Sequence, residues 1–193
     1  MTTFPDSITA GNKDGPANRF LTLSNLLSIV RIVLAVPFAL VMLSGVPSAR
    51  LWGGIIMVAA ALTDRYDGVL ARKFGQTTEW GKILDPVADK IGVAVVAIVL
   101  LVLGNIPPWF VAVLLIRDVL IFSGGMYLRA KKGVVLQSNE TGKWTVGIVA
   151  LTLFLMVLNA QSVVVNIFMW AGIVLLTVSF SFYLGRFMDT IKN

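Results

Sequence analysis

The chain has 193 residues, of which 57% are hydrophobic and only 13% are charged, and its formal net charge is +6. Soluble globular domains carry about 25% charged residues, so this composition excludes an ordinary soluble domain and indicates a polytopic membrane protein. Cysteine and histidine are both absent, which excludes a disulfide framework and any thiolate or imidazole metal site. Any metal must therefore be bound by oxygen, which favours magnesium, manganese or calcium.

The N-terminal segment is polar, and its first 18 residues include two prolines and two glycines. It lacks the apolar core and small-residue cleavage site of a signal peptide, so we expect residues 1–18 to form a flexible cytosolic tail. We expect residues 19–193 to form one membrane domain. Arg19–Leu27 alternates polar and apolar residues loosely, and it fits either a short interfacial helix or the ordinary start of the first span.

Six apolar segments follow, and each is near the ~20 residues needed to cross the hydrocarbon core. They are Leu27–Leu43, Leu51–Leu70, Ile83–Leu103, Pro108–Leu128, Trp144–Leu158 and Val163–Leu184. Backbone polar groups in lipid must be satisfied internally, and the strict alternation of a membrane barrel is absent. The sequence therefore predicts an all-α protein with six transmembrane helices.

Basic residues are concentrated in alternate connections. They are Lys13 and Arg19 before the first span, Arg72, Lys73 and Lys82 after the second, Arg129, Lys131, Lys132 and Lys143 after the fourth, and Arg186 and Lys192 after the sixth. The positive-inside rule then places both termini and the two basic loops on the cytoplasmic side of the inner membrane. These dispersed cations favour anionic lipids and phosphorylated substrates over nucleic acid.

Four aspartates interrupt the second and third apolar segments. Asp64 and Asp67 are three residues apart, and Asp85 and Asp89 are four apart, so each pair shares one helix face. The short connection Lys73–Trp80 makes the two helices antiparallel neighbours, and both pairs then converge near the cytoplasmic ends. A charged side chain at bilayer depth costs roughly 2.5–3.5 kcal/mol, so the acids need compensation.

Two kinds of compensation are open for these acids. Two closely spaced divalent ions could be bound by the carboxylates and could clamp a phosphoryl group. The structural alternative is a set of salt bridges to Arg65, Arg72, Lys82 and Lys90. A divalent-cation transporter would also place acids in a bundle, but transporter sites tend to lie near the midplane of repeated folds. These acids lie toward one edge, and no repeat is visible.

The spacing Asp64-x2-Asp67-Gly68-x2-Ala71-Arg72-x8-Gly81-x3-Asp85-x3-Asp89 resembles the defining motif of the CDP-alcohol phosphotransferase family. The resemblance implies transfer of a phosphatidyl or similar group from a CDP-linked donor to a hydroxyl acceptor, with release of CMP. It also implies dependence on Mg²⁺ or Mn²⁺, with two ions bound, and a homodimer. CDP-diacylglycerol is the implied lipid donor.

The resemblance also assigns roles to single residues. It implies that Asp64, Asp67, Asp85 and Asp89 bind the metal ions, and that Asp89 is also the general base. It implies that Thr63, Gly68, Ala71, Arg72 and Gly81 lie at the donor nucleotide, where Arg72 would stabilise the phosphate charge during catalysis. Small residues in a membrane bundle also serve helix packing, so that role stays open for the glycines and alanine.

The acceptor is less constrained. Leu84–Lys90 and the early Asn25-x2-Ser28-x2-Arg31 resemble the branch that joins CDP-diacylglycerol to glycerol 3-phosphate. A phosphorylated acceptor needs further cations, for which Arg31, Arg117 and Lys143 are the candidates. However, Gly124 and Gly125 stand where that branch often carries a second arginine. The sequence around Arg117 is instead similar to cardiolipin synthases, so phosphatidylglycerol and inositol phosphate stay open as alternative acceptors.

Overall fold

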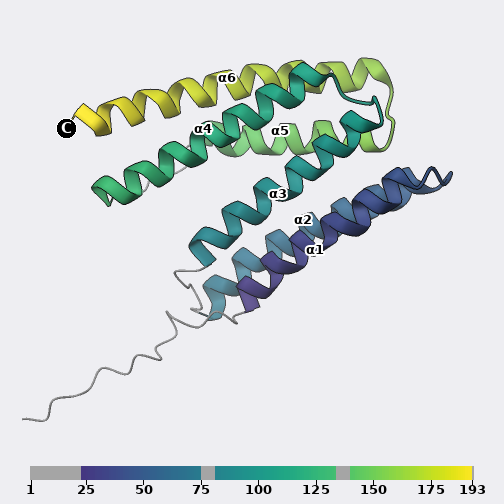
Figure 1. Cartoon of the computed structure of the whole chain (residues 1–193), viewed down its shortest axis with the longest axis horizontal. Helices are drawn as coiled ribbons and strands as arrows, with labels where there is room; N and C mark the ends of the chain where they lie inside the picture. Colours follow the sequence, from purple (N-terminus) through teal and green to yellow (C-terminus); the bar gives the residue numbers. More distant parts are fainter. Residues whose placement is uncertain (1–22, 75–80, 134–139, 193) are drawn as a thin grey trace, which may run out of the picture.

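The computed structural model of the chain describes residues 23–74, 81–133 and 140–192 (Figure 1). Within these ranges, the backbone is helical at residues 23–25, 66–74, 81–86, 132, 140 and 192, but their side chains lie outside the description. The expected tail, residues 1–18, also lies outside the described residues.

Six α-helices and no strand make up the secondary structure of the described residues, which confirms the predicted all-α class. They are α1 (Leu23–Leu43), α2 (Ala49–Phe74), α3 (Gly81–Val102), α4 (Pro108–Lys132), α5 (Glu140–Val157) and α6 (Ser162–Lys192). Each corresponds to one predicted apolar segment, but α2, α4 and α6 extend further into the polar residues that follow. Residues 23–27 belong to the continuous helix α1, so the described part of the candidate interfacial segment is an ordinary helix start.

The helices are those of a polytopic integral membrane protein. Within the described residues, Leu26–Leu43, Pro108–Lys131 and Ser162–Ile191 are long and apolar enough to cross a bilayer, and Thr141–Val157 is a shorter apolar helix. The motif-bearing helices α2 and α3 contain 26 and 22 residues, or about 39 and 33 Å at 1.5 Å per residue. Both lengths exceed a hydrocarbon core of about 30 Å, α2 by more than α3.

Turn residues define the ends of α4. Pro107 has an extended backbone before the first residue, Pro108, where proline costs no helical hydrogen bond. At the other end Gly133 adopts φ 65°, and its N–H donates to the carbonyl oxygen of Arg129 at 3.1 Å. A left-handed glycine of this kind closes a helix without steric cost, so α4 stops there although the charged residues Lys131 and Lys132 are good helix formers.

Helix α3 occupies the middle of the bundle (Figure 1). It packs extensively against α1 and contacts α4 and α5 on the other side. Helix α1 also packs along α2, whereas α2 and α3 do not pack directly against each other within the described residues, so the prediction that they are neighbours is wrong there. The buried core lies largely where α3, α4, α5 and α6 meet, and includes Leu100, Phe110, Leu153 and Leu176. Large apolar side chains such as Leu40 and Val102 are exposed, as expected for helix faces that contact lipid.

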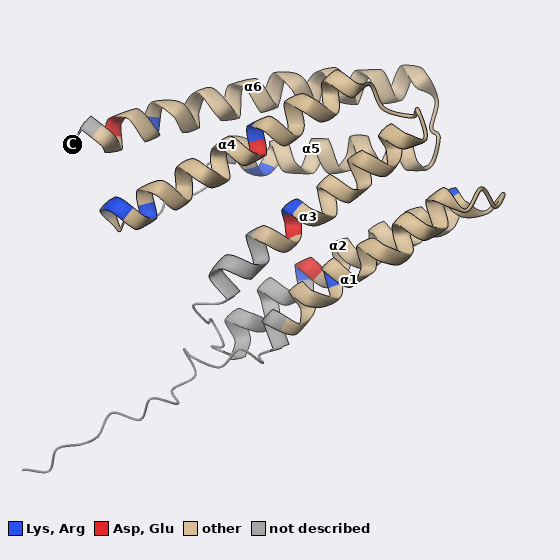
Figure 2. Cartoon of the chain, viewed as in Figure 1, with Lys and Arg blue, Asp and Glu red and all other residues tan. Residues whose placement is uncertain are grey.

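The charged residues are sparse along these helices (Figure 2). The α1–α2, α3–α4 and α5–α6 connections lie at one end of the bundle, and the start of α1 and the end of α6 lie at the other (Figure 1). The end of α2 and the start of α3, which carry the acidic motif, therefore lie at the same end as the start of α1 and the end of α6.

Candidate active site

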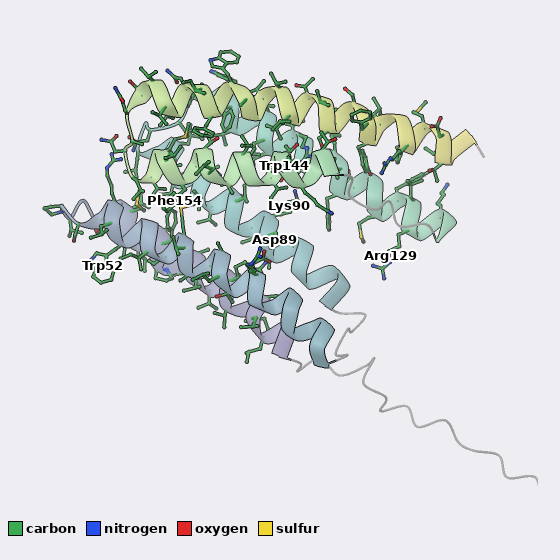
Figure 3. The ribbon with its side chains drawn as sticks, turned by 180° about the vertical axis from the view of Figure 1, so that it is seen from behind. Trp52, Asp89, Lys90, Arg129, Trp144 and Phe154 are labelled. Carbon is green, nitrogen blue, oxygen red and sulfur yellow. The ribbon has the colours of Figure 1, made fainter. Side chains whose placement is uncertain are left out.

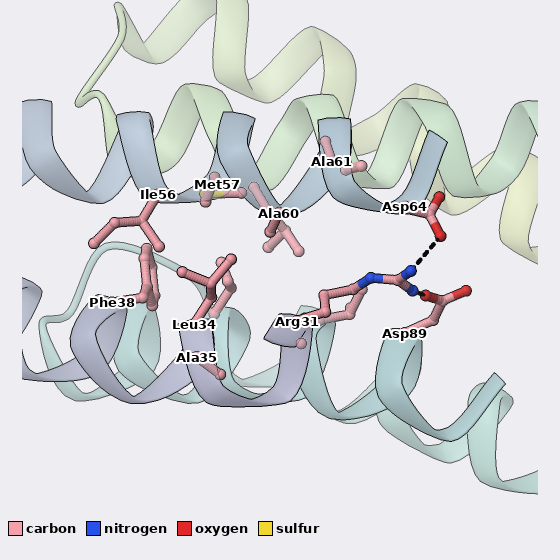
Figure 4. A pocket seen from close by; sticks show the side chains of 15 residues that line it. Arg31, Leu34, Ala35, Phe38, Ile56, Met57, Ala60, Ala61, Asp64 and Asp89 are labelled. Atoms are coloured by element: carbon pink, nitrogen blue, oxygen red, sulfur yellow. Dashed lines mark hydrogen bonds and ion pairs between the residues drawn. The ribbon is translucent and has the colours of Figure 1, made fainter. Parts of the chain in front are cut away.

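A buried arginine joins the two halves of the acidic motif. Arg31 of α1 is only 6% exposed, and its Nη2 lies 2.8 Å from Oδ1 of Asp64 on α2. Its Nη1 donates a hydrogen bond to Oδ1 of Asp89 on α3. Figure 4 shows the guanidinium between the two carboxylates. Residues 31, 64 and 89 come from three different helices, and the tertiary structure brings them to one point.

Helix geometry places this point toward the end of the bundle where α1 and α3 begin. Arg31 is eight residues after the start of α1, and Asp89 is eight residues after the start of α3. At 1.5 Å per residue, each lies about 12 Å from its helix end. The side chains of Asp64 and Asp89 remain 57% and 53% exposed. The acids are therefore accessible from one edge of the bundle, as the sequence predicts.

An apolar cavity extends from these charges into the bundle. Its volume is about 230 Å³, and it is lined by side chains of α1, α2, α3 and α5. Arg31, Asp64 and Asp89 form its charged part, whereas Leu34, Phe38, Met57, Val93 and Leu153 are among its apolar lining (Figure 4). A cavity with a charged end and an apolar wall suits an amphiphilic ligand, whose polar and apolar parts need different surroundings.

Several predicted site residues have a described backbone only. Asp67, Gly68, Ala71 and Arg72 continue helix α2 after Asp64, and Gly81 and Asp85 precede Asp89 on α3. Only the backbone of these six residues is described, and not their side chains. Asp67 follows Asp64 by three residues, and Asp85 precedes Asp89 by four. Because the backbone is helical at these positions, the two residues of each pair lie on the same helix face.

The donor atoms of this site fit a hard divalent ion. Asp64 and Asp89 offer carboxylate oxygens at one cavity, and Mg²⁺ is commonly bound by one or two carboxylates together with water and substrate phosphates. Among the described side chains, no group of three acids is close enough to form a complete metal site. Asp67 and Asp85 are the residues whose helical positions could complete it.

Arg117 belongs to a second charged cluster. Its Nη1 donates to Oδ1 of Asp118 at 2.8 Å, and its Nη2 donates to Oγ of Ser179 on α6 at 3.0 Å. Asp118 also binds Nζ of Lys90 on α3 at 2.6 Å. The side chains of Arg117 and Asp118 are 12% and 13% exposed. None of these four residues lines the cavity at Asp64 and Asp89.

Two other candidates also lie away from that cavity. Thr63 precedes Asp64, but its hydroxyl donates to the carbonyl oxygen of Ala59 on its own helix at 2.8 Å. Lys143 is an exposed residue of α5. Of the three acceptor candidates, only Arg31 lines the cavity at Asp64 and Asp89.

The structure adds partners that the sequence reasoning missed. For Asp64 and Asp89 it supplies Arg31 as an ionic partner, a pairing that the expected salt bridges did not include. Lys90, one of the expected partners, points to Asp118 instead, away from its neighbour Asp89 (Figure 3). The available signal was that Asp118 and Lys90 are charged residues inside apolar helices, which normally require a partner.

Comparison of the sequence with known proteins identifies the family of this chain. Residues 21–178 match the family model described as CDP-alcohol phosphatidyltransferase. A Mycobacterium tuberculosis protein named "Probable phosphatidylglycerophosphate synthase" is 34% identical over 167 residues, which cover 83% of this chain and 78% of that protein. The CDP-diacylglycerol–glycerol-3-phosphate 3-phosphatidyltransferase of Bacillus subtilis is 34% identical, covering 63% of this chain and 68% of the enzyme.

A Mycobacterium bovis protein provisionally named a cardiolipin synthase is 40% identical over 104 residues, covering 54% of this chain and 49% of that protein. The matched family consists of enzymes that generally use divalent metal ions, CDP-diacylglycerol and an alcohol acceptor in the membrane. The family match covers most of the chain and includes all eight positions of the acidic motif. The chain therefore belongs to the CDP-alcohol phosphatidyltransferase family.

Proposed function

We propose that this enzyme transfers the phosphatidyl group of CDP-diacylglycerol to glycerol 3-phosphate and releases CMP. The observation that carries the proposal is the convergence of Asp64 and Asp89 at the charged end of an apolar cavity. A lipid donor with a diphosphate has this same division into charged and apolar parts. The relatives named for glycerol 3-phosphate or phosphatidylglycerophosphate support the choice of acceptor.

In the proposed reaction Asp89 accepts the proton of the acceptor hydroxyl. The hydroxyl oxygen then forms a bond to the phosphorus that carries diacylglycerol, and the bond from that phosphorus to the bridging oxygen of the diphosphate breaks. CMP leaves with the electron pair of the broken bond. A carboxylate can act as this base because its pKa is set by nearby charges.

The remaining motif residues would hold the donor. Asp64, Asp67, Asp85 and Asp89 would bind two Mg²⁺ or Mn²⁺ ions, which when bound would neutralise the phosphates and stabilise charge on the leaving oxygen. Thr63, Gly68, Ala71, Arg72 and Gly81 would surround the nucleotide, with Arg72 near its phosphates. The apolar cavity would take part of the diacylglycerol. Of the three acceptor candidates, Arg31 lines this cavity beside Asp64 and Asp89, whereas Arg117 and Lys143 do not line it.

The cellular arrangement is also part of the proposal. We place the site and both termini on the cytoplasmic side of the inner membrane, because the basic residues cluster in the connections at that end. Residues 1–18 would be a tail and residues 19–193 the membrane domain, and two copies would form a dimer. Water-soluble glycerol 3-phosphate and CMP would then exchange with the cytosol.

The test is an acceptor panel with the purified chain, CDP-diacylglycerol and Mn²⁺ or Mg²⁺. We expect CMP release and a phosphatidylglycerophosphate product with glycerol 3-phosphate, and loss of both after chelation or with Asp89→Asn. Size-exclusion profiles of wild type and variant serve as the folding control. CMP release with none of glycerol 3-phosphate, inositol phosphate, serine or phosphatidylglycerol would overturn the enzymatic proposal, and a divalent-cation flux assay would then test transport.

Cardiolipin synthesis is the second candidate. The relative provisionally named a cardiolipin synthase has the higher identity, although over a shorter stretch. In the same panel, a cardiolipin product from phosphatidylglycerol, with no product from glycerol 3-phosphate, would select this alternative. The two reactions share the donor and the acidic motif, so the acceptor panel distinguishes them where the motif does not.

A further inference from the structure

We propose that Arg31 is the counter-ion of the metal-free site and that it competes with the divalent ion for Asp64 and Asp89. This inference rests on the proposed function, because it takes the two aspartates as metal ligands. It adds a regulatory property: the site should bind metal weakly without the donor and more tightly when the donor is present.

The contacts of Arg31 make it suited to this role. Its guanidinium uses Nη2 for Asp64 and Nη1 for Asp89, so one planar cation binds carboxylates from two helices. The arginine is buried, whereas each carboxylate side chain is about half exposed. The acids can therefore be reached by an incoming ion, while the arginine lies buried behind them.

The positive charge of Arg31 should lower the affinity of the site for a divalent ion. A divalent ion at these carboxylates would stand close to a buried positive charge, and like charges a few ångströms apart repel strongly where water is scarce. The metal ion must then either displace the guanidinium from the carboxylates or bind beside it with a lower affinity. Removing the positive charge of Arg31 should therefore strengthen metal binding. The loss of a residue that contacts the metal ligands would ordinarily be expected to weaken metal binding instead.

The donor supplies a second partner for Arg31. Guanidinium groups bind phosphate oxygens as readily as carboxylates, often through two parallel hydrogen bonds. A donor diphosphate at the charged end of the cavity could receive the displaced guanidinium. Metal and donor would then bind with positive coupling, and each would raise the affinity of the other by the same factor.

The test measures Mn²⁺ binding to the purified full-length chain without donor, by the loss of the electron paramagnetic resonance signal of free Mn²⁺. We expect Arg31→Gln to bind Mn²⁺ at least tenfold more tightly than wild type, and Arg31→Lys, which keeps the charge, to stay within threefold. Arg50→Gln is the matched control, because it removes an arginine from the opposite end of the bundle. It should also stay within threefold.

Equal or weaker Mn²⁺ binding by folded Arg31→Gln would overturn the inference and leave the proposed function standing. A different result would remove both: Mn²⁺ binding by the wild type that is unchanged in an Asp64→Asn, Asp89→Asn double variant. That outcome would show that these acids are not the metal ligands.

A second measurement needs only charge-conserving changes, in case Arg31→Gln does not fold. Side-chain nuclear magnetic resonance of ¹⁵N-arginine protein identifies the Arg31 signal as the one that Arg31→Lys lacks. Saturating Mg²⁺ should shift that signal and speed the exchange of its N–H protons with water. An unchanged Arg31 signal at saturating Mg²⁺ would contradict displacement.

Discussion

Substitution of Asp118 tests how much the ion pairs outside the acidic motif stabilise this helix bundle. Its carboxylate accepts a hydrogen bond from Arg117 at 2.8 Å and binds Lys90 of α3 at 2.6 Å. Asp118→Asn keeps the size of the side chain but removes the negative charge that compensates two cations. We expect this variant to fold with clearly reduced stability.

The structure sets the size of the loss. Removing one partner of a buried ion pair lowers the free energy of unfolding by about 3–5 kcal/mol. Asp118 is close to this buried case, because its side chain is 13% exposed. Lys90 is 36% exposed, so solvent screens its share, and the asparagine oxygen can still accept from Arg117. We therefore expect a loss of about 2–3 kcal/mol. At about 2–4 °C per kcal/mol for a chain of this size, the melting temperature should fall by about 5–10 °C.

Thermal unfolding in detergent, followed by the fluorescence of the five tryptophans, measures this change. Asp189→Asn is the matched control, because Asp189 is an exposed acid near the end of α6. It should shift stability by no more than about 0.5 kcal/mol. Lys90→Met and the Lys90→Met, Asp118→Asn double variant complete a cycle in which the double loss is smaller than the sum of the single losses.

Two results would refute this reasoning. One is an Asp118→Asn melting temperature within 1–2 °C of the Asp189→Asn value, a window on the order of 0.5 kcal/mol. The other is strict additivity in the cycle, because two side chains in contact should couple by about 0.5 kcal/mol or more.

Two further pairs of substitutions test packing and the cavity. Gly124→Ala should lower the free energy of unfolding by about 1–3 kcal/mol, because the added Cβ would lie 2.7 Å from the Tyr183 hydroxyl. In Gly125→Ala the added Cβ would lie 3.9 Å from that hydroxyl, so this variant should be neutral or stabilising in thermal unfolding. Rescue of Gly124→Ala by Tyr183→Phe checks the cause; equal melting temperatures of the two alanine variants would contradict it. Ala60→Leu should raise the KM for CDP-diacylglycerol severalfold in the CMP-release assay, because Ala60 lines the cavity. Ala59→Leu, on an exposed neighbouring position, should not; equal KM values would remove the cavity from donor binding.

The number and type of helices could be predicted because the bilayer sets them. Each helix needs about 20 apolar residues and must satisfy its own backbone, so a run such as Leu27–Leu43 predicts a spanning helix without knowledge of its neighbours. The ends were less predictable. Helix α4 continues through Lys132 and stops at Gly133, where the left-handed backbone conformation, rather than the polarity of the residues, ends it.

The acidic pairs could also be predicted, because three- and four-residue spacings fix a shared helix face before any tertiary contact forms. The sequence by itself therefore determined six helices, with Asp64 and Asp89 on two consecutive ones. Its prediction that these two helices pack against each other was wrong for the described residues, because α2 and α3 each pack against α1 instead. Only the tertiary structure decided the ionic partners. Arg31 lies 58 residues before Asp89, and Lys90 turns to Asp118 although it adjoins Asp89 in sequence. Such pairings depend on which faces of distant helices meet, and residue spacing carries no information about that contact.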